Sequence, residues 1–159
     1  MAEVSLTVGS KAPSFSLLNQ DGETVALKDF KGEKIVVLYF YPKAMTPGCT
    51  TQACGIRDAK RRFTSAGVVV LGISPDMPDK LAKFREKDKL NFDLLSDPDH
   101  AVAEAYGAWG KKKNYGKEYM GVLRSTFVIG VDGKLLHVMP KVNTKTHHDD
   151  VLDWIKANT

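Results

Sequence analysis

The chain has 159 residues, of which 43% are hydrophobic and 26% are charged, and its formal net charge is +4. This length and composition predict one globular domain spanning residues 1–159 and exclude a fibrous or disordered chain. The basic residues are spread along the sequence, with Lys111–Lys113 as the one run of three lysines, so the positive charge does not predict a nucleic-acid partner.

The start of the chain predicts no address outside the cytoplasm. The first ten residues contain no Arg and no apolar segment of the signal-peptide type. The longest apolar run, Ile35–Tyr41, is far shorter than the roughly 20 residues of a membrane span. We therefore expect a cytoplasmic protein with no membrane partner. The only two cysteines, Cys49 and Cys54, would lie in a reducing compartment, where a disulfide is more often transient and catalytic than structural.

Hydrophobic patterning in the first half predicts a hairpin followed by a βαβ unit. Phe15–Leu18 and Thr24–Leu27 flank a turn and predict an N-terminal β-hairpin. Two β-branched and aromatic runs, Ile35–Tyr41 and Val68–Ile73, have the composition of strands that are buried on both faces. A helix is expected between them, from about Thr50 to Ala66. A strand, a helix and a strand in this order predict two parallel strands joined by a crossover.

The second half predicts further helices and strands around a lysine-rich segment. In chain order these are a helix over Pro78–Leu90, a strand at Phe92–Leu95, a short helix at His100–Tyr106, hairpin strands at Ser125–Ile129 and Lys134–Val138, and a helix over Thr146–Ala157. Aromatic residues surround the lysine run, and we interpret this segment as a loop packed beside the functional site rather than a platform for single-stranded nucleic acid. The sum is an α/β fold of the thioredoxin-like type, with a mixed central sheet, helices on both faces and an added N-terminal hairpin.

The two cysteines lie where such a fold places its chemistry. Cys49 and Cys54 follow the first buried strand and open the helix after it, and open α/β sheets carry their sites at the carboxyl ends of strands. A thiol in the first turn of a helix faces unpaired backbone N–H groups and the positive end of the helix dipole, which favour the thiolate. A second thiol close behind can trap the oxidised form of the first. The pattern therefore predicts redox chemistry.

A known family carries this pattern. The spacing Pro42-x-x-x-Thr46-x-x-Cys49 resembles the active-site signature of the peroxiredoxins, and the stretch from Tyr39 to Asp58 is similar to their bacterioferritin-comigratory-protein (PrxQ) branch. Further segments extend the resemblance over nearly the whole chain: Gly9–Leu17, Leu71–Ser74, Leu95–Asp97 and Arg124–Ile129. The resemblance implies a thioredoxin-like peroxiredoxin fold and a thiol-dependent peroxidase for hydrogen peroxide and organic hydroperoxides, with no metal or organic cofactor.

The resemblance also implies a role for each residue of the signature. Cys49 would attack the peroxide and become a sulfenic acid, which Cys54 would resolve as an intramolecular disulfide. Arg124 occupies the Arg-x-Thr-Phe position of peroxiredoxins, and its rigid donors can contact the sulfur and a peroxide oxygen together. Thr46 has a hydroxyl that can accept a hydrogen bond from the peroxide and donate one to the thiolate.

The remaining roles concern charge, water and recycling. The backbone N–H groups of Gly48 and Cys49 would hold the developing negative charge, as an oxyanion hole does. Pro42, which lacks an N–H, would shield the sulfur from water. The reductant implied by the resemblance is thioredoxin, with glutaredoxin as an alternative. A resolving thiol within the same chain makes a monomer the expected state.

Helix geometry adds a prediction about the cycle. Five residues along an ideal helix separate two Cα atoms by roughly 8.7 Å. A disulfide tolerates only about 7 Å. The helix from Cys49 to about Gly55 must therefore unwind before the bond closes, and we expect a loss of helical circular dichroism on oxidation.

Three features depart from the branch pattern or invite another interpretation. Ala44-Met45 stands where polar residues are common, which would make the pocket rim more apolar and favour bulkier hydroperoxides. Gln52 replaces a common Glu and can still accept a hydrogen bond from an Arg, without charge. The pair His147-His148 precedes acidic residues at a helix start, and we interpret both as surface and capping groups rather than zinc ligands.

Two rival functions remain open at this point. A thioredoxin-like disulfide reductase or isomerase would have Cys-x-x-Cys and a Pro before the strand that faces the site. This chain instead has Cys-x-x-x-x-Cys, and Arg124-Ser125-Thr126 precede Phe127. The second rival is a non-catalytic redox-sensing or DNA-shielding protein, which would bind DNA in a salt-sensitive way without consuming peroxide.

Overall fold

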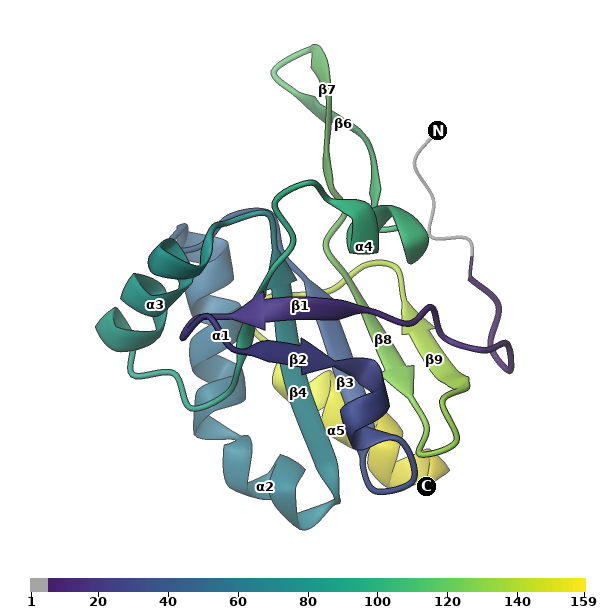
Figure 1. Cartoon of the computed structure of the whole chain (residues 1–159). Helices are drawn as coiled ribbons and strands as arrows, with labels where there is room; N and C mark the ends of the chain where they lie inside the picture. Colours follow the sequence, from purple (N-terminus) through teal and green to yellow (C-terminus); the bar gives the residue numbers. More distant parts are fainter. Residues whose placement is uncertain (1–5) are drawn as a thin grey trace.

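A computed structural model describes residues 6–159, which form a mixed sheet covered on both faces, with one hairpin standing apart (Figure 1). The strands are Ser16–Asn19 (β1), Thr24–Ala26 (β2), Ile35–Phe40 (β3), Val68–Ser74 (β4), Leu94–Ser96 (β5), Trp109–Asn114 (β6), Lys117–Val122 (β7), Ser125–Ile129 (β8) and Leu135–Met139 (β9). The helices are Leu27–Phe30 (η1, a 3₁₀ helix), Pro47–Asp58 (α1), Lys60–Ser65 (α2), Pro78–Lys87 (α3), Ala101–Ala105 (α4) and His147–Asn158 (α5).

The central sheet has seven strands in the order β2-β1-β5-β4-β3-β8-β9. Strands β3, β4 and β5 run parallel, whereas β8 is antiparallel to β3 and to β9, and β1 is antiparallel to β2 and to β5. The predicted βαβ unit, the N-terminal hairpin and the C-terminal hairpin are therefore present. The mixed α/β fold predicted from the sequence is confirmed.

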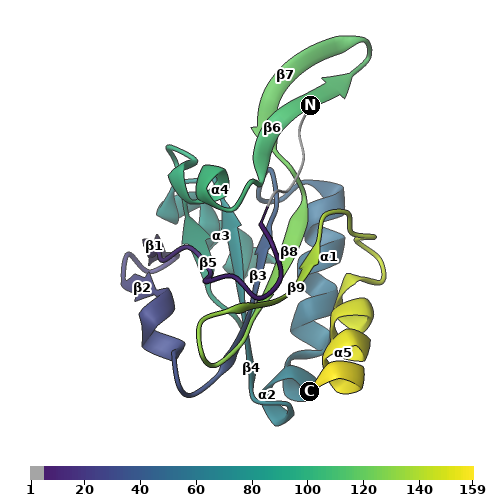
Figure 2. The same ribbon diagram turned by 90° about the vertical axis from the view of Figure 1, so that its right-hand side faces the viewer.

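Strand β3 shows why both faces of this sheet need cover. Alternate residues point to opposite faces of a strand. Val37 and Tyr39 belong to a buried cluster with α1, α2, α3 and α5, whereas Val36, Leu38 and Phe40 belong to a second cluster with α4 and the N-terminal segment. Figure 2 shows α1 and α5 side by side on one face. The apolar run of β3 is continuous because its residues enter two cores, one on each face of the sheet. Each fully buried aliphatic or aromatic side chain contributes about 1.5–3 kcal/mol to the stability of the fold.

The helix predicted over residues 50–66 is two helices, which corrects the single-helix expectation. The first begins earlier, at Pro47, and the chain leaves helical geometry at Ala59, where φ is −93° and ψ is 3°. Alanine has the highest helix propensity, so no local signal marks this break. The result places the whole of α1, with both cysteines, between β3 and the turn at Ala59.

The segment predicted as a loop around the lysine run is a β-hairpin instead. Strands β6 and β7 pair with each other and form a separate two-stranded sheet that projects from the body (Figures 1 and 2). The two turn residues, Tyr115 and Gly116, have φ values of 52° and 80°, and positive φ at both positions is typical of the type I′ hairpin turn. Exposed lysines occupy the strands, so the alternation of apolar residues that marks a half-buried strand is missing.

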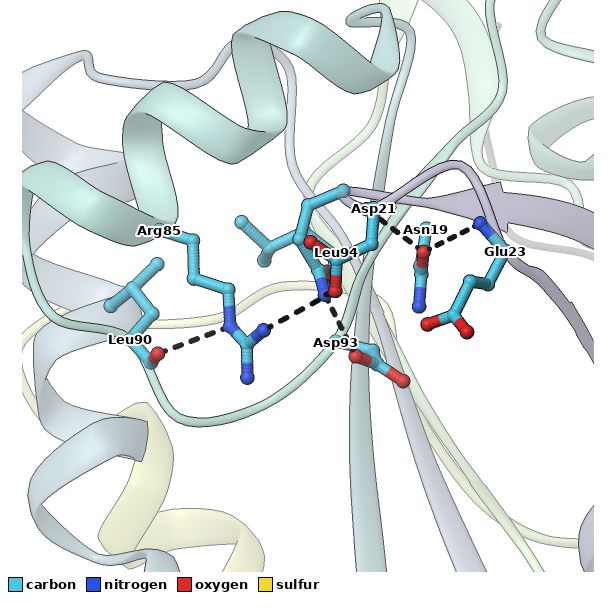
Figure 3. A network of polar contacts seen from close by, with 8 residues as sticks. Asn19, Asp21, Glu23, Arg85, Leu90, Asp93 and Leu94 are labelled. Atoms are coloured by element: carbon cyan, nitrogen blue, oxygen red, sulfur yellow. Dashed lines mark hydrogen bonds and ion pairs between the residues drawn. The ribbon is translucent and has the colours of Figure 1, made fainter.

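Polar contacts hold the turn of the N-terminal hairpin against α3, as Figure 3 shows. The side-chain oxygen of Asn19 accepts hydrogen bonds from the backbone N–H groups of Asp21, at 2.9 Å, and Glu23, at 3.0 Å. Arg85 of α3 lies 3.9 Å from the carboxylate of Asp21 and donates to the carbonyl of Leu90. Among these contacts, that between Arg85 and Asp21 joins the hairpin turn to α3, and the pairing of β1 with β5 fixes the hairpin to the βαβ core. Within residues 6–159, no helix has the length and apolar character needed to cross a membrane.

Candidate active site

The loop between β3 and α1 is held in place by the end of the neighbouring strand. The backbone N–H of Ala44 donates to the carboxylate of Asp76 at 2.7 Å, and the hydroxyl of Ser74 donates to the same carboxylate oxygen at 2.8 Å. Met45 has a φ of 66°, a strained conformation for a residue with a side chain. Ala44 is 3% exposed and so does not form part of an apolar rim, which corrects the expectation made for it. Pro42 is half-buried at the start of this loop.

Cys49 and Arg124 meet because of the strand order. The guanidinium Nη2 of Arg124 lies 3.2 Å from the sulfur of Cys49. Phe40, the last residue of β3, pairs with Ser125, the first residue of β8, so Arg124 lies beside the point where the chain turns into α1. Cys49 is 1% exposed and its thiol is free. A guanidinium at this distance from a buried sulfur stabilises negative charge on that sulfur.

Backbone N–H groups face the same region. Pro47 begins α1, and Thr46 caps it with an extended backbone, so the N–H groups of Gly48 and Cys49 fall in the first turn, where the helix supplies no acceptor. A side-chain carbon built at Gly48 would lie 3.6 Å from Nη2 of Arg124, which places the Gly48 backbone beside the guanidinium. The first turn of α1 and Arg124 therefore place donors in the same region, and Arg124 contacts the sulfur of Cys49 directly.

Gln52, one turn after Cys49, holds the other branch of the guanidinium. Its side-chain oxygen accepts from Nη1 of Arg124 at 2.5 Å, as expected from the sequence, and the residue is fully buried. Its amide nitrogen lies 3.2 Å from Nδ1 of His147, whose Nε2 lies 2.7 Å from the hydroxyl of Thr126.

The interpretation of His147 as a surface and capping group is wrong, since His147 is 1% exposed. Its position carried a signal that the sequence reasoning missed. His147, Val151 and Ile155 recur every four residues and share the buried face of α5. His148 is half-buried and packs against α1 at Gly55, where a side-chain carbon would collide with its ring. The two adjacent histidines therefore have different environments.

Cys54 lies in the same helix as Cys49 and is likewise a free thiol, but it is half-buried. Burial raises the pKa of Cys54 above its usual value, and the carboxylates of Asp88 and Asp58 raise it further, whereas Arg57 opposes the shift. Because α1 is continuous from Pro47 to Asp58, the two thiols are separated by more than one helical turn. A bond between them requires that this helix open.

Comparison with known proteins agrees with this site. The model of the AhpC/TSA family matches residues 8–138. Peroxiredoxin Bcp of Escherichia coli K12 is 56% identical over 153 residues, which make up 96% of this chain and 97% of that protein. The crystal structure of peroxidoxin BcpB from Mycobacterium tuberculosis superimposes with a TM-score of 0.85 at 37% identity, over 97% of this chain and 99% of that one. The chain belongs to the AhpC/TSA family, as a peroxiredoxin of the Bcp type.

A second structural relative bears on substrate. The bacterioferritin comigratory protein of Xanthomonas campestris, studied for its alkyl peroxide reduction activity, has a TM-score of 0.85 at 34% identity over 90% of each chain. Like its relatives, the present peroxiredoxin is a thiol-dependent peroxidase. The predicted family and the predicted peroxidase activity are confirmed.

One contact of this peroxiredoxin differs from the expectation for Thr46. Its hydroxyl donates to the backbone carbonyl of Lys43 at 2.9 Å, rather than to the sulfur of Cys49. A hydroxyl has one hydrogen and two lone pairs, so the oxygen of Thr46 keeps its capacity to accept. The bond to Lys43 closes the loop before α1 and fixes where that oxygen lies.

The base of the projecting hairpin lies beside the peroxiredoxin site, although its tip does not. Lys112 donates to the carbonyl of Val122 at 2.9 Å. Burial lowers the pKa of Lys112, as does the positive charge of Arg124, whereas the charge of Cys49 raises it. Tyr115 at the tip is 99% exposed. The link between this hairpin and the site is therefore the electrostatic interaction of Lys112 with Arg124 and Cys49.

A separate cavity of about 180 Å³ lies at the other end of the sheet. Val36, near the start of β3, lines it together with Ile129, whereas Cys49 follows the opposite end of β3. The cavity therefore does not serve the sulfur. In the part of the chain that the structure describes, no group of three or more His, Cys, Asp or Glu side chains is arranged to hold a metal ion.

Proposed function

We propose that Cys49 is the residue that reduces the peroxide and that Arg124 activates it. The observation that supports this assignment is the 3.2 Å contact between Nη2 of Arg124 and the Cys49 sulfur at the first turn of α1. The substrates are hydrogen peroxide and organic hydroperoxides, and the alkyl peroxide reduction named for the X. campestris relative supports the second class.

The first step is an attack by sulfur on oxygen. The Cys49 thiolate donates an electron pair to one peroxide oxygen, the O–O bond breaks, and the other oxygen leaves as hydroxide or alkoxide and takes up a proton. Cys49 becomes a sulfenic acid. Arg124 and the N–H groups of Gly48 and Cys49 stabilise the charge that moves from sulfur to the leaving oxygen. Thr46 accepts a hydrogen bond from the peroxide O–H, and Pro42 shields the sulfur from water.

The second step joins the two cysteines. The Cys54 thiolate attacks the sulfur of the sulfenic acid, expels hydroxide, which becomes water, and leaves a Cys49–Cys54 disulfide. This step requires α1 to unwind from Cys49 to about Gly55. An external dithiol protein, thioredoxin or glutaredoxin, then reduces the disulfide by exchange and completes the cycle.

The chain acts as a monomer of one domain in the cytoplasm in this proposal. Support comes from the position of both thiols in α1, because a resolving thiol in the same chain removes the need for a second subunit. Of the two residues considered for an apolar pocket rim, Ala44 is buried, so preference among hydroperoxides depends on Met45. Met45 is partly buried and packs against the core cluster. Equal kcat/KM for hydrogen peroxide and a fatty hydroperoxide would remove the support for a preference for bulky substrates.

The test is peroxide consumption with a thioredoxin system by the wild type, Cys49→Ser and Cys54→Ser. We expect Cys49→Ser to abolish turnover. Cys54→Ser should consume one equivalent of peroxide and then stop, and Cys49 should become prone to over-oxidation. Full turnover by Cys49→Ser would overturn the assignment. Insulin reduction faster than peroxide turnover would favour a disulfide reductase instead, and salt-sensitive DNA binding without peroxide consumption would favour a DNA-shielding protein.

A further inference from the structure

His147, the first residue of α5, is a buried histidine that none of the steps above uses. It contacts α1 through Gln52 and β8 through Thr126, and its ring packs against that of Tyr39, with the centroids 5.6 Å apart. Buried polar groups are expensive unless they are paired, and both ring nitrogens of His147 are paired. The side chain therefore joins three elements immediately behind the reactive cysteine.

The hydrogen bonds from Arg124 through Gln52 and His147 to Thr126 form a series. Arg124 can only donate, and this fixes the direction of each bond in the series. The atom of Gln52 that faces Nη1 of Arg124 must be its carbonyl oxygen, so its NH₂ group faces His147. Nδ1 of His147 must then accept, and the ring proton must sit on Nε2. From there it is donated to the hydroxyl of Thr126. Only a neutral His147 with this tautomer satisfies all these contacts.

We propose that His147 is a positioning residue for the peroxidase reaction, acting through Gln52 to hold the Arg124 guanidinium against the Cys49 sulfur. This inference rests on the proposed function of Cys49 and Arg124. Without an acceptor for its NH₂ group, the Gln52 side chain would be held only at its oxygen end and would adopt further rotamers. In those rotamers the oxygen moves away from Nη1 of Arg124, which loses its acceptor.

The surroundings of His147 keep the ring neutral. Burial lowers the pKa of His147 to about 4, and the positive charges of His148 and Arg124 also lower it, whereas Asp150 opposes them. Tyr39 presents an aromatic ring rather than a charge. A protonated ring would carry a hydrogen on Nδ1 and would face the NH₂ group of Gln52 with a second donor. The chain of contacts is thus intact at neutral pH.

The same contact links His147 to the opening of α1. Gln52 lies between Cys49 and Cys54, in the segment that must unwind before the disulfide forms. Unwinding withdraws Gln52 from both Arg124 and His147, because both bonds depend on its place in the helix. His147 therefore stabilises the closed helix, in which the sulfur meets the peroxide, against the open one.

Two isosteric substitutions separate the two bonds of His147. In His147→Asn the side-chain oxygen takes the place of Nδ1 and can accept from Gln52, whereas the bond to Thr126 is lost. In His147→Gln the side-chain nitrogen takes the place of Nε2 and can donate to Thr126, whereas the acceptor for Gln52 is lost. Each variant loses one buried hydrogen bond, so both should lower Tm by similar amounts.

The two variants should differ in activity, although their Tm values are expected to be similar. We expect His147→Gln to lower kcat/KM for hydrogen peroxide about tenfold, measured by stopped-flow reaction of the reduced enzyme, because the guanidinium is no longer fixed. His147→Asn should stay within about twofold of the wild type, given that its contact with Gln52 remains. His148→Asn is the matched control, the same substitution one residue further along, and should also leave kcat/KM unchanged.

A double-mutant cycle with Gln52→Ala gives the decisive result. If His147 acts through Gln52, His147→Gln should cost no further activity once Gln52 is alanine. Additive losses, or equal losses in His147→Gln and His147→Asn that follow Tm, would reduce His147 to a structural residue and overturn the inference. If Cys49→Ser consumed peroxide as fast as the wild type, the proposed function itself would be overturned. The failure of the inference and the failure of the proposed function are therefore distinguishable.

Discussion

The two cysteines of α1 lie about 1.4 helical turns apart and have different surroundings. Cys49 is buried in the first turn, with Arg124 at 3.2 Å. Cys54 is half-buried further along, where the carboxylates of Asp88 and Asp58 oppose its ionisation. The difference shows that one helix can place one thiol against a guanidinium and the other among groups that raise its pKa.

This contrast also orders the two thiols in time. In the proposed cycle the closed helix favours attack by Cys49 over attack by Cys54, because Arg124 contacts the first thiol and the second has a raised pKa. Opening of α1 would expose Cys54 to water and move it away from Asp88, and both burial and Asp88 raise its pKa. The conformational change that brings the sulfurs together would therefore also activate the second thiol.

Removal of the guanidinium should have the largest effect and should act on Cys49 alone. We expect Arg124→Ala to lower kcat/KM for hydrogen peroxide by about 10²–10³-fold, because a preorganised donor to the reacting atoms is lost. Arg124→Lys is the matched control and should recover only part of the activity, since one ammonium cannot contact sulfur and Gln52 together. Unchanged kcat/KM in Arg124→Ala would show that Arg124 does not distinguish the surroundings of Cys49 from those of Cys54.

Oxidation should erase the contrast, because the proposed cycle joins both sulfurs in one disulfide. A helix places their Cα atoms roughly 8.7 Å apart, beyond the about 7 Å that a disulfide tolerates. One equivalent of peroxide should therefore lower the far-UV helical signal and expose α1 to trypsin at Arg57. Cys54→Ser should show neither change after the same treatment. Identical spectra for the two redox states of the wild type would argue against Cys54 as the resolving thiol.

Much of this arrangement could be predicted from the sequence, because the decisive signals are local. The apolar run of β3, Pro47 at the helix start and the spacing from Pro42 to Cys49 each act within a few residues. The approach of Arg124 to Cys49 was predicted from the resemblance alone, since no local rule links residues 75 positions apart.

The parts that the sequence reasoning missed depend on tertiary contacts or on exposed strands. His147 resembles a surface residue beside His148 and two aspartates, and only its four-residue spacing to Val151 marks the buried face. The helix break at Ala59 occurs at a residue with high helix propensity. The β6–β7 hairpin has exposed strands, so the apolar period that indicates a strand was not available.

Low pH should reduce the free energy of unfolding through protonation of His147, which lies behind Cys49. Its pKa is lowered to about 4 in the fold, against about 6.5 when unfolded, so the unfolded chain binds the proton first. The stability from keeping this ring neutral is present above pH 6.5 and is lost as the pH falls toward 4, by about 3 kcal/mol in total. Denaturant unfolding from pH 7 to pH 4 should show this loss in the wild type beyond that in His147→Gln. Parallel curves for the two proteins would contradict the burial of a neutral ring.

The smallest effect should appear at Cys54 and should leave Cys49 unchanged. Asp88 raises the pKa of Cys54, so Asp88→Asn should lower the pH midpoint for alkylation of Cys54. The measurement is the iodoacetamide rate against pH in a Cys49→Ser background, where one thiol remains. At a pH below the midpoint, the rate should rise a few-fold, in proportion to the thiolate fraction. Arg124→Lys in the same background should leave the midpoint in place, because Arg124 is not among the groups that shift this thiol. If both substitutions moved the pH midpoint of Cys54, the two ends of α1 would share one electrostatic environment. The proposed order, in which Cys49 reacts first and Cys54 only after α1 opens, would then lose its support.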